Sequence, residues 1–207
     1  EGVKLSKILA LNSDLALALA AHPIRIEAPI PGKSLVGIEV PNKSAAIVRL
    51  GSLIAYPEFR ESGLLTFVLG RAVSGELIMA DMDKMPHLLV AGSTGSGKSV
   101  AIHSLIVSLL YKNSPGTLRF AMIDPKRVEL SVYNDLPHMI APVITEGKKA
   151  IGLLRWTIKE LERRYEVLLG AGARDIRSYN QKNKEALPYL VIIVDEMADL
   201  MSAFGKE

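Results

Sequence analysis

A glycine-rich segment near the middle of the chain has the sequence Gly92-Ser93-Thr94-Gly95-Ser96-Gly97-Lys98-Ser99. It matches the phosphate-binding pattern G-x-x-x-x-G-K-[ST] at every fixed position. The apolar residues Leu88, Leu89 and Val90 precede it, and apolar residues at helical spacing follow it. A strand over residues 87–91, a loop and a helix are the context that the pattern requires. The segment therefore predicts a nucleotide-binding P-loop.

The residues of this segment have different predicted roles. The backbone from Gly92 to Val100 surrounds the phosphates of the nucleotide, because the loop and the first helical turn direct N–H groups at one concavity. Lys98 reaches the β- and γ-phosphates and is a catalytic candidate, and the Ser99 hydroxyl ligates Mg²⁺. A glycine-rich turn with an exposed lysine is the alternative, and it leaves the small residues before Lys98 unexplained.

Composition excludes some classes of protein and leaves others open. The chain has 207 residues and 49% hydrophobic residues, enough for one large or two small domains. It has no cysteine, which excludes disulfides and zinc–thiolate sites. No apolar run approaches the roughly 18 residues of a membrane span, so we expect a cytoplasmic segment without membrane contact. A net charge of +3 permits a nucleic-acid partner without arguing for one.

Two regions of the chain differ in the length and order of their predicted helices and strands. Residues 1–63 contain short pieces, with a strand predicted over 3–8, a helix over 15–21 and strands over 24–27 and 35–40, which together indicate a small α+β domain. Residues 64–207 alternate strands with helices, which predicts an α/β fold with a mostly parallel, doubly wound sheet.

A long helix is predicted over about residues 145–169. Its apolar residues recur at intervals of three and four, which predicts one buried stripe along the helix. The stripe consists of Ile151, Leu154, Ile158, Leu161, Tyr165 and Leu168.

A pair of carboxylates follows the last predicted strand. The unbroken apolar run Leu190–Val194 is typical of a central strand of a parallel sheet and ends in Asp195-Glu196. Ligands of open α/β sheets bind at the carboxyl ends of the strands. We expect Asp195 to hold Mg²⁺ beside Ser99, and Glu196 to accept a proton from the attacking water. Alternatively the pair is an acidic helix N-terminus, but the upstream P-loop favours hydrolysis.

Two other classes of P-loop protein are disfavoured by their missing motifs. A GTPase needs N-K-x-D, and the nearest match, residues 183–186, lacks the aspartate. An ABC transporter ATPase needs an L-S-G-G-Q-like segment, which residues 178–181 do not supply. An ATPase that couples hydrolysis to mechanical work remains.

Beyond these motifs, much of the chain resembles the FtsK/SpoIIIE family of double-stranded DNA translocases. The resembling segments of the second region are 85–99, 123–126, 129–133, 136–138, 142–143, 154–156, 160–165, 179–180 and 188–201. In the first region, residues 15–21, 24–26, 31–32 and 37–42 resemble the small α subdomain of that family.

The resemblance implies a RecA-like ATPase that uses ATP and Mg²⁺ and forms a homo-hexameric ring around duplex DNA. Such motors act in chromosome segregation and cell division, and full-length members are often tethered to the inner face of the membrane. Residues 1–63 would be the α subdomain and residues 64–207 an incomplete RecA-like core. We expect such a motor-domain fragment to hydrolyse ATP weakly by itself. A conjugation or secretion coupling ATPase, or a nucleotide-gated assembly module, stays open as an alternative.

Basic residues before the acidic strand are candidates for DNA contact. Arg174, Arg177, Lys182 and Lys184 would contact phosphates without reading bases, although an ordinary solvated helix face is an equal alternative. Arg163 and Arg164 could act across a subunit interface, but Glu160 lies four residues before Arg164. This spacing favours an i,i+4 ion pair within one helix.

Overall fold

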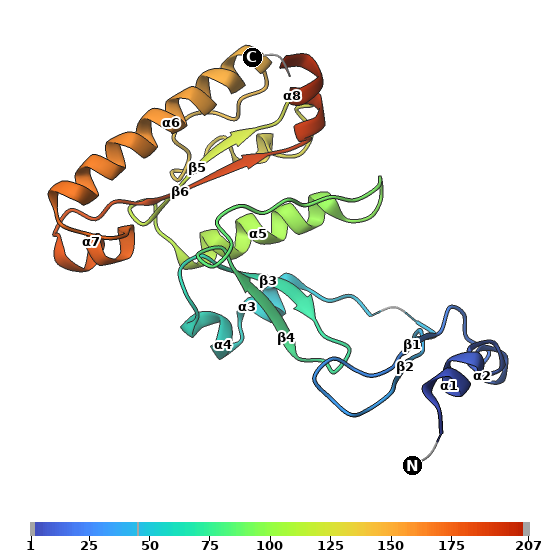
Figure 1. Ribbon diagram of the computed structural model, residues 1–207. Helices are drawn as coiled ribbons and strands as arrows, with labels where there is room; N and C mark the ends of the chain where they lie inside the picture. The colour runs from blue at the N-terminus through green and yellow to red at the C-terminus, as the bar shows by residue number, and fades with distance from the viewer. Residues whose placement is uncertain (1–2, 45, 205–207) are drawn as a thin grey trace. The chain divides into compact units, whose positions relative to one another are not determined.

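The computed structural model describes residues 3–44 and 46–204 and divides into two compact units, Glu1–Val48 and Arg49–Glu207 (Figure 1). The second unit begins before the expected boundary at residue 64. It includes α3 (Leu50–Ile54) and α4 (Pro57–Glu61), whose buried side chains pack against Val68 of the following strand.

The first unit contains two short helices and a hairpin. Helices α1 (Leu5–Ala10) and α2 (Asn12–Ala18) precede the antiparallel strands β1 (Arg25–Glu27) and β2 (Gly37–Glu39). The strand predicted over residues 3–8 is wrong, because α1 occupies most of that range. A strand requires a hydrogen-bonding neighbour, and β1 and β2 pair only with each other within the described residues.

In the second unit a hairpin follows α3 and α4, and the P-loop helix packs against it. Strands β3 (Thr66–Arg71) and β4 (Leu77–Asp81) pair antiparallel, and α5 (Lys98–Lys112) packs against β3. The backbone N–H of Val68 donates to the Ser108 hydroxyl, and Lys112 Nζ donates to the carbonyl of Ser62 at 2.8 Å. These contacts hold the C-terminal half of α5 in place.

Two parallel strands form the centre of the second unit. β5 (Leu118–Ile123) and β6 (Tyr189–Val194) pair in parallel along their full length. The segment 138–144, after the short helix η1 (Ser131–Tyr133), lies along the other edge of β5 through single bridges. Helices cover both faces of this sheet, which explains why β6 is apolar along its whole length.

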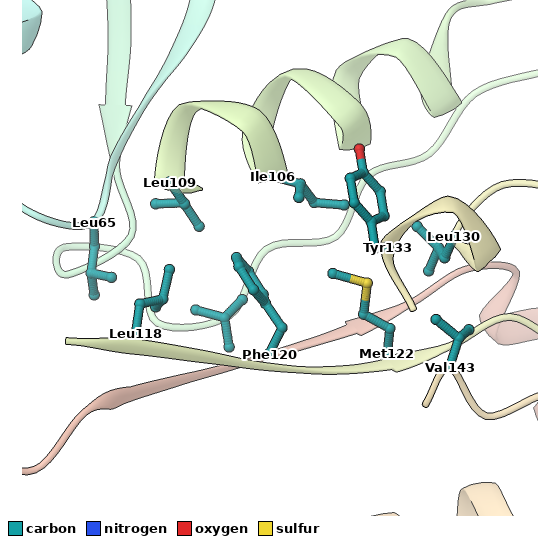
Figure 2. Packing of buried hydrophobic residues seen from close by; sticks show 10 residues of the cluster. Leu65, Ile106, Leu109, Leu118, Phe120, Met122, Leu130, Tyr133 and Val143 are labelled. Carbon is teal, nitrogen blue, oxygen red and sulfur yellow. The ribbon is translucent and has the colours of Figure 1, made fainter. Parts of the chain in front are cut away.

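Helices cover the sheet on both faces. One face meets α5, and Figure 2 shows Ile106 and Leu109 of that helix facing Leu118, Phe120 and Met122 of β5. The other face, with Ala121 and Ile123, meets residues of α6 (Gly147–Gly170) and α8 (Met197–Phe204). Layers of helix, parallel sheet and helix are the arrangement that the alternating pattern predicts.

The strand predicted over residues 87–91 is not formed. This segment makes no ladder with any described residue, and the side chain of Leu89 is 84% exposed. An apolar run becomes a strand only beside a partner. Among the described residues the parallel sheet consists of β5 and β6, and residues 87–91 add no strand to it.

The predicted burial of the stripe along α6 is wrong for most of its length. Of the helix residues only Ala150 and Leu153 are buried, while Ile158 and Tyr165 are more than half exposed. The sheet is too narrow to cover more than the first turns of a 24-residue helix.

Within the described residues no helix is both long enough and apolar enough to cross a membrane.

The predicted ion pair within α6 is confirmed. Glu160 contacts Arg163 and Arg164, each at 2.7 Å, and Arg164 also donates to the carbonyl of Pro188 before β6. The hydrogen bond from Arg163, then that from Arg164, lowers the pKa of Glu160 to about 2 against the opposing effect of burial. Both arginines are therefore engaged within their own helix.

Glu160→Gln tests this pairing through the pH dependence of stability. A carboxyl group with a lowered folded-state pKa stabilises the fold above its unfolded pKa, and the contribution is lost as the pH falls toward 2. We expect the variant to lose about 1 to 2 kcal/mol of unfolding free energy at pH 7, and a difference that shrinks below about pH 4.5. Urea denaturation between pH 3 and pH 8 measures it, with Glu162→Gln on the exposed side of the helix as the control. A deficit independent of pH would contradict the assignment.

Candidate active site

The P-loop makes a tight turn at the N-terminus of α5. Gly97 is the N-cap of the helix, with φ of 94° in the left-handed region that favours glycine. A Cβ atom on Gly92 would clash with the hydroxyl oxygen of Ser96 and lie 3.2 Å from its Cβ, so a larger residue there would displace the Ser96 side chain. The backbone N–H of Ser96 donates to Ser93 O at 3.0 Å. The folded loop and the free N–H groups of the helix start form a place where an anion can bind.

The paired strands bring three carboxylates to one edge of the sheet. The register pairs Ile123 with Val194, so Asp124 and Asp195 follow the two strands side by side. The backbone N–H of Asp195 donates to Ile123 O at 2.9 Å. Glu196 has φ of 53°, a left-handed conformation that costs a residue other than glycine about 1 to 2 kcal/mol. Backbone strain of this kind is found at active sites, where the fold fixes the direction of a functional side chain.

Lys98 connects the P-loop to the acidic strand. Its Nζ lies 3.2 Å from Glu196 Oε2, to which it donates, and 3.3 Å from Asp195 Oδ1. The hydrogen bond with Glu196 raises the pKa of Lys98, burial opposes this shift, and the charge of Asp195 adds to it. The hydrogen bond from Lys98, together with the charge of Lys126, lowers the pKa of Glu196. The structure thus brings together the two motifs that the sequence predicted to meet.

Lys126 is a second cation at this site, and it lies outside both sequence motifs. Its Nζ lies 3.5 Å from Glu196 Oε2 and 3.5 Å from Asp199 Oδ2. The rule that placed Asp195-Glu196 at the carboxyl edge of a strand applies equally to Asp124-Pro125-Lys126 after β5. Applying that rule to both strands would have found this residue.

Ser99 contacts a carboxylate that the sequence analysis also left without a role. The Ser99 hydroxyl donates to Glu129 Oε1 at 2.9 Å. Glu129 is held by its backbone, since the N–H groups of Glu129 and Leu130 both donate to Asp124 Oδ2 at 3.0 Å. Asp124 is fully buried, so it anchors the loop after β5 rather than facing the site.

Ser99 and Asp195 offer a hydroxyl and a carboxylate oxygen, which are ligand types that Mg²⁺ takes. Asp195 is 4% exposed, and its Oδ1 has no hydrogen-bond partner among the described residues, because its contact with Lys98 lacks hydrogen-bond geometry. The described residues contain no group of three or more Asp, Glu or His side chains that could hold a metal ion by themselves. Mg²⁺ needs no such group, since one or two protein oxygens and phosphates suffice.

The basic residues considered for DNA contact lie outside this cluster. Arg174 is 94% exposed and 3.9 Å from Asp175, whereas Arg177 on α7 (Ile176–Lys182) pairs with Asp83. Lys182 ends that helix and Lys184 follows it, both exposed and without ion pairs in the described ranges. Arg177 also lines a surface cavity of about 420 Å³ with Asp81, Asp83, Asn180 and Tyr189. Of these four basic residues, Lys182 and Lys184 are the ones without an ion pair among the described residues.

Comparison with known sequences gives two family matches that together span most of the chain. The FtsK/SpoIIIE family matches residues 53–207, and the FtsK alpha domain matches residues 1–42. The DNA translocase FtsK of Caldanaerobacter subterraneus is 54% identical over 208 residues, which cover 100% of this chain and 29% of that protein. The DNA translocase FtsK of Clostridium tetani is 52% identical over 97% of this chain and 28% of its own length. The chain therefore spans less than a third of either relative.

Solved structures with the same fold belong to coupling and secretion proteins. The monomer form of the pCW3 conjugation coupling protein TcpA with ATPgS aligns with a TM-score of 0.61 at 27% identity, over 99% of this chain and 55% of its own. The cytoplasmic domain of the type VII secretion ATPase EccC from Thermomonospora curvata aligns with a TM-score of 0.63 at 26% identity, over 78% of this chain and 22% of its own. With the family match, these likenesses confirm the predicted α/β, RecA-like P-loop fold.

Lys98→Met tests whether this lysine provides the charge for an anion. Without it, Asp195 has no cation beside it and Glu196 keeps only the contact with Lys126, so the two carboxylates repel a polyphosphate. We expect the affinity for ATP to fall at least about tenfold, which corresponds to about 1.4 kcal/mol. Fluorescent ATP analogues measure this affinity in the full-length protein, with the exposed Lys84→Met as the matched control. Equal affinities for Lys98→Met and the unchanged protein would contradict this role.

Proposed function

The chain belongs to the FtsK/SpoIIIE family, and from this membership we propose that it is the ATP-hydrolysing part of a motor that moves along double-stranded DNA. The observation that carries the proposal is the junction at Lys98, where the P-loop meets Asp195 and Glu196 within 3.3 Å. A loop for phosphates and a glutamate beside it are the parts that ATP hydrolysis requires.

Nucleotide binding starts from the ion pairs of the free site. We place the phosphates on the backbone of residues 92–97 and on the first turn of α5. Lys98 then exchanges its carboxylate partners for phosphate oxygens. Ser99 and Asp195 provide the protein oxygens for Mg²⁺, and a bound Mg²⁺ neutralises charge on the phosphates.

Hydrolysis depends on what the exchange does to Glu196. Once Lys98 contacts phosphate, Glu196 loses its nearest cation and keeps only the longer contact with Lys126. Its carboxylate can then orient a water molecule and accept its proton as the water oxygen attacks the γ-phosphorus and the bond to the leaving phosphate breaks. The ionised form is the one needed. In the free site the hydrogen bond from Lys98 and the charge of Lys126 lower the pKa of Glu196, and Lys126 stays beside it after Lys98 has turned to the phosphates.

Assembly and DNA contact complete the proposed motor. We propose a homo-hexameric ring on the cytoplasmic side of the membrane with duplex DNA in its channel, acting in chromosome segregation and cell division. Arg174, Arg177, Lys182 and Lys184 are the proposed phosphate contacts. Lys182 and Lys184 are the stronger candidates because Arg177 is already paired with Asp83.

A coupling ATPase for conjugation or secretion is the second candidate function. The structural likeness to TcpA and EccC favours it, at 27% and 26% identity. The relatives named DNA translocase FtsK are about twice as similar in sequence over nearly the whole chain. This difference favours movement of duplex DNA.

ATP turnover of the full-length protein with and without duplex DNA tests the proposed function. We expect duplex DNA to stimulate turnover, and Glu196→Gln to bind ATP while turnover falls at least about 100-fold through loss of the general base. Glu162→Gln on α6 is the matched control. Stimulation only by a protein substrate would favour the coupling ATPase. If Glu196→Gln still binds ATP and leaves the function of the full-length protein unchanged, a nucleotide-gated assembly module would be favoured, whereas loss of DNA pumping with ATP still bound would exclude that module.

The salt dependence of DNA binding tests the two lysines. Each phosphate contact adds about 0.9 to the slope of log affinity against log salt concentration. We expect the double variant Lys182→Ala/Lys184→Ala to reduce this slope by roughly 2, with similar effects on different DNA sequences. Lys148→Ala/Lys159→Ala on α6 is the control pair. An unchanged slope would remove Lys182 and Lys184 from the DNA interface.

A further inference from the structure

We propose that Glu129 is a positioning residue for Mg²⁺, which it serves by holding the hydroxyl of Ser99 in the orientation that metal binding requires. This inference rests on the proposed function, because it concerns the same nucleotide site. It assigns a role to a residue outside both sequence motifs, on the loop that follows β5.

The contact between Ser99 and Glu129 has the right donor and acceptor. A serine hydroxyl has one proton to donate and two lone pairs to offer. The Ser99 hydroxyl donates its proton to Glu129 Oε1 at 2.9 Å. With the proton committed to the carboxylate, the lone pairs remain for a cation. Carboxylates in such outer positions fix the orientation of metal ligands and raise their basicity.

The loop holds Glu129 in place independently of Ser99. Asp124 is buried at the end of β5, and its Oδ2 accepts the N–H groups of both Glu129 and Leu130. The backbone N–H of Asp124 in turn donates to Ile144 O at 2.8 Å. Leu130 is fully buried in the core beneath α5. A side chain on such an anchored segment loses little conformational freedom when it accepts a hydrogen bond.

A second group supports the other oxygen of the carboxylate. His103 Nε2 lies 3.4 Å from Glu129 Oε2, and His103 Nδ1 lies 2.7 Å from the hydroxyl of Tyr133. The contact of Nδ1 with the Tyr133 hydroxyl holds the ring so that Nε2 faces Glu129 Oε2. His103 and Ser99 are four residues apart on α5, so one face of the helix presents both groups to Glu129.

The arrangement gives Glu129 a different task from Asp195 and Glu196. Asp195 and Glu196 form ion pairs with Lys98 in the free site. In the proposed nucleotide complex Lys98 contacts phosphate instead. Glu129 lies near no lysine or arginine within the described ion pairs, so nucleotide binding has no cation to remove from it. It stays available to the Ser99 hydroxyl before and after the nucleotide binds.

A purely structural role would predict a different outcome. If Glu129 only joined α5 to the loop after β5, its loss would reduce thermal stability and weaken nucleotide binding equally with and without Mg²⁺. A role in metal positioning predicts loss confined to the Mg²⁺-dependent part of binding. Binding of ADP in EDTA is the readout that separates the two.

The test uses Glu129→Gln and Glu129→Ala in the full-length protein, with Glu162→Gln as the matched control. Binding of a fluorescent ADP is titrated with Mg²⁺ and repeated in EDTA. We expect the Mg²⁺ concentration for half-maximal effect to rise about tenfold or more in Glu129→Ala, and less in Glu129→Gln, whose amide oxygen still accepts from Ser99. Binding in EDTA and the melting temperature are expected to match the control. An unchanged Mg²⁺ titration in both variants, or equal losses with and without Mg²⁺, would overturn the assignment.

A double-mutant cycle shows whether Glu129 acts through Ser99. In the Ser99→Ala background we expect Glu129→Ala to have no further effect on the Mg²⁺ titration, because the hydroxyl that it orients is gone. An additive effect would overturn the proposed mechanism. Failure of the unchanged protein to bind nucleotide with Mg²⁺ would instead refute the proposed function itself, and the inference with it.

Discussion

Lys98 joins two parts of the chain that lie far apart in the sequence. Its ammonium group contacts Glu196 at 3.2 Å and Asp195 at 3.3 Å, and so connects the P-loop to the end of the central strand. Asp195 is buried, and a buried carboxylate without a cation is strongly unfavourable. The site therefore needs a positive charge at this point. In the nucleotide-bound state that we propose, the lysine turns to phosphate and a metal ion would replace its charge beside Asp195.

The fold produces this junction with few elements. The register of β5 and β6 aligns Asp124 with Asp195 at one edge. One aspartate turns inward to anchor the loop that carries Lys126 and Glu129, and the other faces the P-loop. Helix α5 packs on β5 through Ile106 and Leu109, which are fully buried. This packing positions Lys98 and Ser99, at the start of α5, relative to the carboxyl edge of the sheet. Two carboxylates after two neighbouring strands thus have separate tasks.

The sequence predicted the parts whose pattern is local. The loop, its helix, β6 and the ion pair at Glu160 follow from the residue pattern within short segments. Three predictions failed because they depended on partners. Residues 3–8 and 87–91 lack a strand neighbour among the described residues, and most of the α6 stripe extends beyond the sheet that was expected to cover it. Glu129 was missed because its contact with Ser99 arises only when α5 packs over the loop after β5. Lys126 was missed because the rule for strand ends was applied to β6 and not to β5.

A structure of the full-length protein with Mg²⁺ and ATPγS tests the central claim most directly. The account predicts that Lys98 Nζ lies about 3 Å from a phosphate oxygen and more than about 4 Å from Glu196, with Asp195 facing the metal ion. A nucleotide-bound structure in which Lys98 still contacts both carboxylates, with the phosphates elsewhere, would contradict it.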